Sequence, residues 1–247
     1  MWHRFRYAEN GSLKQMLEEF GNLSEALVAG YMAEVLEGLH YLHHSDIVHC
    51  NLKAANILMT KNGDVKHSDF GISLNLNATE HGIKAVPCPP NWTAPEILEL
   101  KRGSTRSDIW SLGCTVIELL TGRPPYGDII YGASGTGPYL SLISTLRCVA
   151  KQNKLSSVVM SQIVEDVCPP IPEGLSDLLV TFLKVCFYKV PDQRPSAKKL
   201  SQHEWLTWSL SKVREHGSIL TLAGSEMTPP CIYRTRSLKT TSPSRRF

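Results

Sequence analysis

Residues 49–58 read HCNLKAANIL, and two shorter motifs follow them, DFG at residues 69–71 and APE at residues 94–96. Each motif alone is short enough to occur by chance. Their order and spacing are informative, because a phosphoryl-transfer site needs several parts in fixed places. These parts are a base for the substrate hydroxyl, a lysine near the moving phosphate and two oxygen ligands for magnesium. Together the three motifs therefore indicate a phosphoryl-transfer site.

The residues on either side of the first motif predict a long helix and a small hairpin. The helix should begin after a cap at Asn22 or Ser24 and end within residues 43–46. Its apolar face recurs at three- and four-residue spacing, at Leu27, Tyr31, Val35, Leu39 and Leu42. After the motif, the apolar run at residues 57–59 and the turn signal Asn62-Gly63 predict a β-hairpin.

A second helix is predicted from about residue 107 to residue 120, with Ser107 or Asp108 as its cap. Its apolar residues lie on all sides, so we expect a central and fully buried helix. Two further helices, separated by a proline-containing connection, are predicted at residues 175–187 and 196–206. The fold class predicted by these patterns is mainly α with a small β-hairpin.

The composition is that of an ordinary globular protein. The chain has 247 residues, of which 42% are hydrophobic and 20% charged. No apolar run is long enough to span a bilayer, and the N-terminal MWHRFR lacks the apolar stretch of a secretion signal. The seven cysteines contain no C-x-x-C pair, so we expect free thiols in a reducing compartment, the cytoplasm. These features exclude a disulfide scaffold, a zinc module and a membrane-spanning protein.

The C-terminal end is basic and differs from the rest of the chain. Residues 211–247 carry seven Lys and Arg against Glu215 and Glu226, whereas the whole chain has a net charge of +3. From about Gly217 onward the sequence shows no periodicity and is rich in Ser, Thr and Pro. We therefore expect residues 209–247 to be a disordered, solvated tail rather than an arm that binds nucleic acid or a membrane surface.

Over residues 7–208 the chain resembles the C-terminal lobe of a eukaryotic protein kinase. Its sequence is most similar to those of the fungal septation-initiation serine/threonine kinases and the plant epsilon-type MAP kinase kinase kinases. The phrases that carry this resemblance are YLHHSDIVHCNLKAANIL (residues 41–58), SDIWSLGCTVIELLTGRPPY (107–126) and IVEDVCPPIPEGLSDLL (163–179). The resemblance implies a helical kinase C-lobe with a small hairpin, preceded by a non-matching segment, residues 1–6, and lacking the N-terminal β-lobe.

Residues 132–161 have no counterpart in this family that we can identify. Structureless loops of this length are uncommon inside compact domains. The segment is either a true insertion, with a helix at about residues 139–151, or translated non-coding sequence.

The resemblance also implies roles for individual residues. Lys53 would contact the transferred phosphate, and Asn56 and Asp69 would hold Mg²⁺. Leu58 would form the floor of the adenine pocket of ATP, whose edge would bond the backbone of Tyr7 and Ala8. Residues expected to support the site are His49 and Phe70 (stacked in the hydrophobic spine), Gly71 (a turn after Asp69), Asp108 (bonded to the catalytic loop) and Arg194 (paired with Glu96).

Several positions depart from the family pattern. Asn51 stands where the family has its catalytic aspartate, and a neutral amide cannot take the proton of the incoming hydroxyl. Cys50 replaces an arginine that pairs with an activation-loop phosphate, and Pro89 replaces a threonine that helps to place the substrate. No G-x-G-x-x-G loop and no V-A-I-K lysine are present. We therefore expect weakened ATP and Mg²⁺ binding and impaired catalysis.

Three functional interpretations remain from the sequence. The first is a serine/threonine protein-kinase-like domain, in a family that transfers phosphate from ATP to proteins, with impaired catalysis at Asn51. The second is a pseudokinase module that binds a kinase, GTPase or scaffold of a septation- or MAP-kinase-type pathway. The third is a truncated product without function. All three imply protein partners at most, with no nucleic acid and no membrane span.

Overall fold

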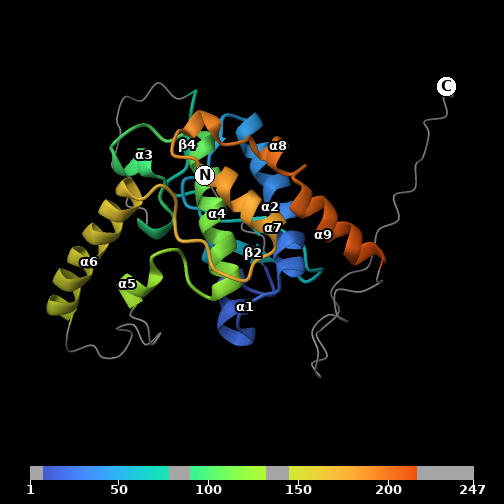
Figure 1. Cartoon of the computed structure of the whole chain (residues 1–247), viewed down its shortest axis with the longest axis horizontal. Coiled ribbons are helices and arrows are strands. Elements are labelled where there is room, and N and C mark those ends of the chain that lie inside the picture. The colour runs from blue at the N-terminus through green and yellow to red at the C-terminus, as the bar shows by residue number, and fades with distance from the viewer. Residues whose placement is uncertain (1–7, 78–89, 132–144, 216–247) are drawn as a thin grey trace, which may run out of the picture.

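The structure, a computed structural model, describes residues 8–77, 90–131 and 145–215. These residues are mainly helical, as predicted, with two small antiparallel sheets (Figure 1). The helices are α1 (Leu13–Phe20), α2 (Glu25–His44), α3 (Pro95–Leu98), α4 (Thr105–Thr121), α5 (Gly127–Tyr131), α6 (Thr145–Glu165), α7 (Asp177–Cys186), α8 (Ala197–Leu200) and α9 (Glu204–Glu215). The strands are β1 (Ile47–Val48), β2 (Ile57–Met59), β3 (Val65–His67) and β4 (Leu74–Asn75). Three short 3₁₀ turns are η1 (Ala54–Asn56), η2 (Pro90–Trp92) and η3 (Pro191–Gln193).

Helix α4 forms the centre of the molecule, with α2 and α7 packed against it (Figure 1). Ile109, Leu112 and Val116 have no exposed surface, which confirms the prediction of a fully buried helix. The cap differs from the prediction, because Ser104 and Ser107 form a capping box and the helix begins at Thr105. The helix therefore starts before Ser107, which lies inside its first turn.

Helix α2 begins and ends where the sequence predicts. Ser24 occupies the N-cap position, although its side chain makes no capping hydrogen bond. On the predicted face, Tyr31, Val35 and Leu39 are buried, and the outer members Leu27 and Leu42 are half-buried. The helix packs against α4, α8 and α9 and so joins the centre of the fold to its C-terminal part.

The predicted hairpin is present and consists of β2 and β3. Ile57 pairs with His67 and Met59 with Val65, and the turn between them includes Gly63 at φ 86°. Only glycine adopts this left-handed conformation at little cost, which explains the turn signal. A second pair, β1 with β4, was not predicted, because two-residue strands carry no periodicity.

Helices α1 and α6 differ from the sequence predictions. Helix α1 follows a capping box between Ser12 and Gln15, a signal that the sequence analysis did not use. Helix α6 runs to Glu165, whereas a helix was expected only at about residues 139–151. Val159 and Ile163 lie four positions apart on α6 and are buried in the core. The end of the segment at 132–161 therefore contributes to the core.

The single helix expected at residues 196–206 is in fact two helices. Helix α8 ends at Leu200, and α9 begins at Glu204 after His203, whose Nδ1 accepts the Trp205 N–H at 3.2 Å. Helix α9 also continues past the expected boundary at residue 208 and ends at Glu215, and Ser209 in this part is buried. Residues 209–215 are therefore helical and not part of a disordered tail.

Several predictions fall on residues that the structure does not describe. Tyr7 and the rest of residues 1–7, Pro89, residues 132–144 and residues 216–247 lie outside the described part of the chain. Among the helices that are described, none is long and apolar enough to cross a membrane.

A buried ion pair joins the segment before α8 to α3. The Arg194 guanidinium donates to both carboxylate oxygens of Glu96, at 2.7 and 2.8 Å, as the sequence analysis expected. Ser107 Oγ donates to the same carboxylate at 2.8 Å, and Arg194 Nε donates to the Tyr188 carbonyl. The guanidinium also lies 5.1 Å from the ring centre of Trp110. Arg194 is 1% exposed, so its charge depends on these partners.

A second buried carboxylate, Glu118, joins α4 to two loops. Its Oε2 accepts the backbone N–H of Ala54 in η1 at 3.0 Å and the indole N–H of Trp92 in η2 at 2.9 Å. Burial raises the pKa of Glu118 above its ordinary value, although the two hydrogen bonds and nearby lysines act in the opposite direction. Burial therefore favours the protonated form of Glu118 relative to an exposed glutamate.

We predict that Arg194→Met lowers the free energy of unfolding by about 3–5 kcal/mol, because it leaves the Glu96 carboxylate buried without its cation. Urea denaturation followed by circular dichroism measures this loss. Arg102→Met, which removes an exposed arginine, is the matched control and should change stability by less than about 0.5 kcal/mol. Equal effects of the two substitutions would contradict the importance of the buried pair.

We also predict that Glu118→Gln changes how stability depends on pH. Because the pKa of Glu118 is raised on folding, its contribution to stability is fully present below the unfolded value of 4.5. That contribution is lost as pH rises through the folded pKa. Glutamine does not titrate. The unfolding free energy of the variant minus that of the original protein should therefore increase as pH rises.

Urea denaturation at several pH values between about 5 and 8 gives this difference. Glu173→Gln, at an exposed position, is the control and should show a difference independent of pH. The same flat difference for Glu118→Gln would show that its carboxyl group is not perturbed by burial.

Candidate active site

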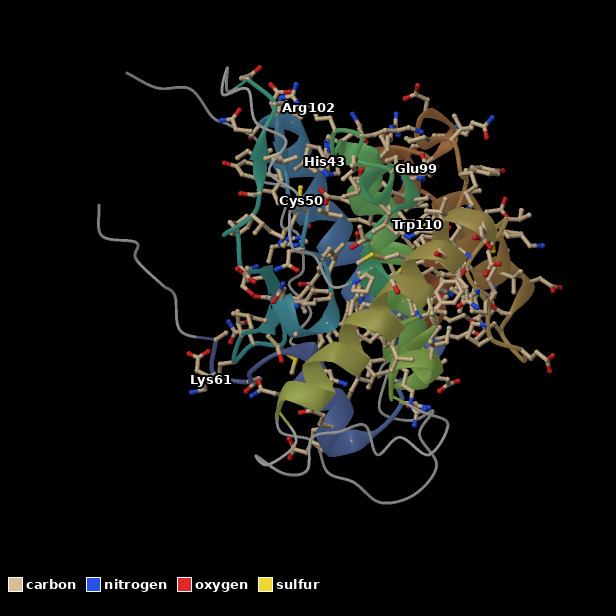
Figure 2. The ribbon with its side chains drawn as sticks, turned by 90° about the vertical axis from the view of Figure 1, so that its left-hand side faces the viewer. His43, Cys50, Lys61, Glu99, Arg102 and Trp110 are labelled. Atoms are coloured by element: carbon tan, nitrogen blue, oxygen red, sulfur yellow. The ribbon has the colours of Figure 1, made fainter. Side chains whose placement is uncertain are left out.

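One buried carboxylate holds the loop of residues 49–56, which runs from β1 to η1. The Asp108 carboxylate accepts the backbone N–H groups of His49 and Cys50, each at 2.9 Å. His43 Nε2, at 2.8 Å, is its third partner, and His43 lies close to Cys50 in Figure 2. Asp108 has no exposed surface, so the three donors replace water around its charge. The loop backbone is thereby fixed to the first turn of α4.

The hydrogen bonds to Asp108 support a strained backbone. Cys50 has φ 64°, a conformation that a residue with a side chain adopts at a cost of about 1–3 kcal/mol. The same conformation recurs at Asp69, with φ 60°, directly after β3. Two of the five non-glycine residues with positive φ in the described part of the chain therefore lie in the candidate site.

The structure brings Asn51, Asn56 and Asp69 together. Asn51 Nδ2 donates to Asp69 Oδ2 at 2.8 Å, and Asn56 Nδ2 donates to the Asn51 carbonyl at 2.7 Å. The Asn56 carbonyl in turn accepts the N–H of Ser68, at 2.9 Å, and its hydroxyl, at 3.0 Å. The end of β3 and the loop of residues 49–56 thus form one hydrogen-bonded unit. Lys53 lies in the same loop and is half-buried.

The donor set at this place fits a hard divalent cation. Asn56 uses its N–H₂ group toward Asn51, which leaves Asn56 Oδ1 free of that bond, and Asp69 supplies carboxylate oxygens. An amide oxygen and one carboxylate suit Mg²⁺, which keeps several waters, better than a soft metal. No group of three or more His, Cys, Asp or Glu side chains that could hold a metal occurs within residues 8–77, 90–131 and 145–215.

Three aromatic rings pack behind Asp69. The His49 ring lies 5.0 Å from the ring of Phe70 and 5.4 Å from the ring of His67, centre to centre. The sequence analysis expected His49 and Phe70 to stack in a hydrophobic spine. The two ring planes are tilted by 47°, and Phe70 is 43% exposed. Desolvation lowers the pKa of His49 below its ordinary value, and it lowers the pKa of His67 to about 4. At neutral pH both rings are therefore neutral and add no positive charge beside Asp69.

Leu58 and the segment before α1 lie next to each other. Ile57 and Met59 are buried in the core, while Leu58, between them on β2, is half-buried on the opposite face. Ser12 bridges to Leu58, and the Asn10 N–H donates to the Met59 carbonyl at 3.2 Å. The segment that contains Ala8 is thus attached beside the expected adenine floor.

Gly71 lies in a turn that follows Asp69 and Phe70. The residue of this segment with positive φ is Asp69. A methyl group at Gly71 would come 3.3 Å from Asp69 Oδ1, a close but adjustable approach. Asp69 tolerates the left-handed conformation because short polar side chains can bond locally.

Sequence reasoning missed three residues that organise this site. His43 and Glu118 were treated only as parts of helices, and His67 was not singled out. His67 Nε2 donates to the Val35 carbonyl in α2 at 2.9 Å. The available signal was Gly38, a glycine in the middle of a helix, which often marks a close approach. A Cβ at Gly38 would lie only 2.5 Å from Cδ2 of His67.

Sequence comparison relates the chain to known protein kinases. The sequence model of the protein kinase domain matches residues 1–206 of the chain. The chain is 42% identical over 219 residues to MAP3K epsilon protein kinase 2 of Arabidopsis thaliana, which covers 86% of the chain and 14% of that protein. It is 41% identical over 200 residues to cell division control protein 7 of Schizosaccharomyces pombe, covering 81% of the chain and 16% of that protein.

A further relative is cytokinesis protein sepH of Emericella nidulans, with 42% identity over 200 residues, 81% of the chain and 13% of that protein. The chain thus spans at most 16% of the length of these three relatives. The match to the domain covers most of the chain and includes every motif of the site. The chain belongs to the serine/threonine protein kinase family.

Proposed function

We propose that this chain is the catalytic part of a serine/threonine protein kinase domain in which phosphate transfer to protein hydroxyls is impaired. The observation that carries the proposal is the state of Asn51, whose amide N–H is turned to Asp69. An amide cannot take the proton of an incoming hydroxyl. General-base catalysis typically contributes about 10²–10⁴ in rate, so its loss slows the reaction without removing the site.

The remaining groups keep the roles that the family implies. Asn56 Oδ1 and the Asp69 carboxylate would hold Mg²⁺, which neutralises charge on the phosphates of ATP when both are bound. Lys53 would hold the transferred phosphate through its charge, and Leu58 would support the adenine ring. The backbone that aims these side chains is held by Asp108, whatever residue stands at position 51.

We also propose a second candidate, a pseudokinase module that binds a kinase, GTPase or scaffold protein in the cytoplasm. The observation that favours it is that Asp108, Glu118 and the pair of Glu96 with Arg194 form their contacts without the reactive groups. A stable helical surface can therefore persist without catalysis. The names of the relatives, a MAP3K and two division proteins, suggest a septation- or MAP-kinase-type pathway for either candidate.

We predict that Asn51→Asp raises phosphate transfer about 10²–10⁴-fold, because it restores a proton acceptor at the reacting hydroxyl. Transfer of radiolabelled phosphate to a basic protein substrate is measured for the chain joined behind the N-terminal lobe of a related kinase. Asp69→Ala should abolish the transfer. Asn77→Asp, an exposed asparagine outside the site, is the control and should have no effect.

Equal rates for the original chain and Asn51→Asp, both lost on Asp69→Ala, would show that Asn51 does not limit phosphate transfer. No transfer by any variant, together with a cooperative thermal melt that ATP and Mg²⁺ do not shift, would favour the pseudokinase module.

A further inference from the structure

The amide of Asn51 lies against the carboxylate that the proposed function assigns to the cation. The two groups are 2.8 Å apart, from Asn51 Nδ2 to Asp69 Oδ2. An ionised carboxylate only accepts hydrogen bonds, so the amide can face it only with its N–H. Such a bond to a charged acceptor is stronger than one between neutral groups. The N–H therefore supplies partial positive charge to an oxygen that a cation would otherwise share.

Both partners of this bond are fixed by their backbones. The Asn51 N–H donates to His49 Nδ1 at 3.2 Å, and its carbonyl accepts from Asn56 Nδ2. On the other side, Ser68, the residue before Asp69, is bonded twice to the Asn56 carbonyl. The backbones on both sides of the contact are thus held in the folded frame, while the Asp69 side chain itself is exposed.

The side-chain oxygen of Asn51 indicates that the Asp69 carboxylate determines how the Asn51 amide is oriented. Asn51 Oδ1 is buried and accepts no hydrogen bond from the described residues. A buried amide oxygen without a donor is unfavourable, so an amide free to turn would present this oxygen to water or to an N–H. Asn51 keeps the unfavourable orientation, and the Asp69 carboxylate is the group that gains from it.

We propose that Asn51 is a positioning residue. Its side-chain N–H donates a hydrogen bond to the Asp69 carboxylate at the place where a divalent cation would bind, and so weakens cation binding. The inference rests on the proposed function, since it takes Asp69 and Asn56 as the cation ligands. A cation that binds Asp69 must displace the Asn51 N–H or share its oxygen. In the absence of a cation, the same bond keeps the loop of residues 49–56 joined to the end of β3.

Titration of the full chain with Mn²⁺, followed by water proton relaxation, tests the proposal. Asn51→Ala removes the competing N–H and should tighten Mn²⁺ binding about tenfold, the low end of what a charged hydrogen bond contributes. Asp69→Ala should abolish this binding. Asn77→Ala is the matched control, because Asn77 Nδ2 donates to Asp46 Oδ2 at 2.9 Å in the same way but far from Asn56 in the chain. It should leave Mn²⁺ affinity unchanged.

The outcomes separate the inference from the proposed function. Asp69-dependent binding that Asn51→Ala leaves unchanged, or weakens because Asn51 Oδ1 is itself a ligand, overturns the inference alone. Mn²⁺ binding that does not depend on Asp69 overturns the proposed cation site, and the inference with it.

A second measurement needs no substitution. In ¹⁵N-labelled protein, Mg²⁺ should move the side-chain amide signal of Asn51, because the cation displaces its hydrogen bond. The signal of Asn77 should stay in place. An Asn51 signal that stays unchanged while Mn²⁺ binds in an Asp69-dependent manner would also overturn the inference.

Discussion

The carboxylate of Asp108 is the contact on which the candidate site depends. Through the N–H groups of His49 and Cys50 it carries a loop whose backbone would not adopt its left-handed turn unaided. The charge can remain buried because His43, at the end of α2, supplies a third donor. One side chain therefore couples the position of the site to the packing of the two longest well-buried helices. A shift of α4 against α2 would move every reactive group in the loop.

Helix α4 holds the loop of residues 49–56 through a second carboxyl group, Glu118, near its other end. Asp108 and Glu118 project from α4 to opposite ends of the loop, while Glu96 is held by Arg194. The frame is thus made of buried, hydrogen-bonded carboxyl groups, and the reactive groups lie on the loops between them. A substitution such as an asparagine at position 51 changes the chemistry and leaves this frame in place.

Much of the fold could be predicted, because its decisive elements are long and periodic. Helices α2 and α4 and the hairpin follow from apolar spacing and one glycine turn. Short elements such as β1, β4 and the break between α8 and α9 could not be predicted, since two to four residues carry no period. At the site, motifs identified Asn51, Asn56 and Asp69, but no pattern in a sequence reveals which way an amide turns. The orientation of Asn51 depends on a carboxylate 18 positions away.

The close approach of Gly38 and His67 has a consequence for how this chain can be altered. The imidazole fills the space that a side chain at position 38 would need, and it bonds the backbone of the same helix at Val35. A substitution at Gly38 therefore requires a compensating substitution at His67, and the reverse also holds. A hairpin exchanged for that of another kinase would leave a void beside Gly38 unless its residue at this place were as large as histidine. A helix exchanged alone would collide with the ring if it carried a side chain at the position of Gly38. Chimeras of this domain should accordingly take α2 and β3 from the same parent.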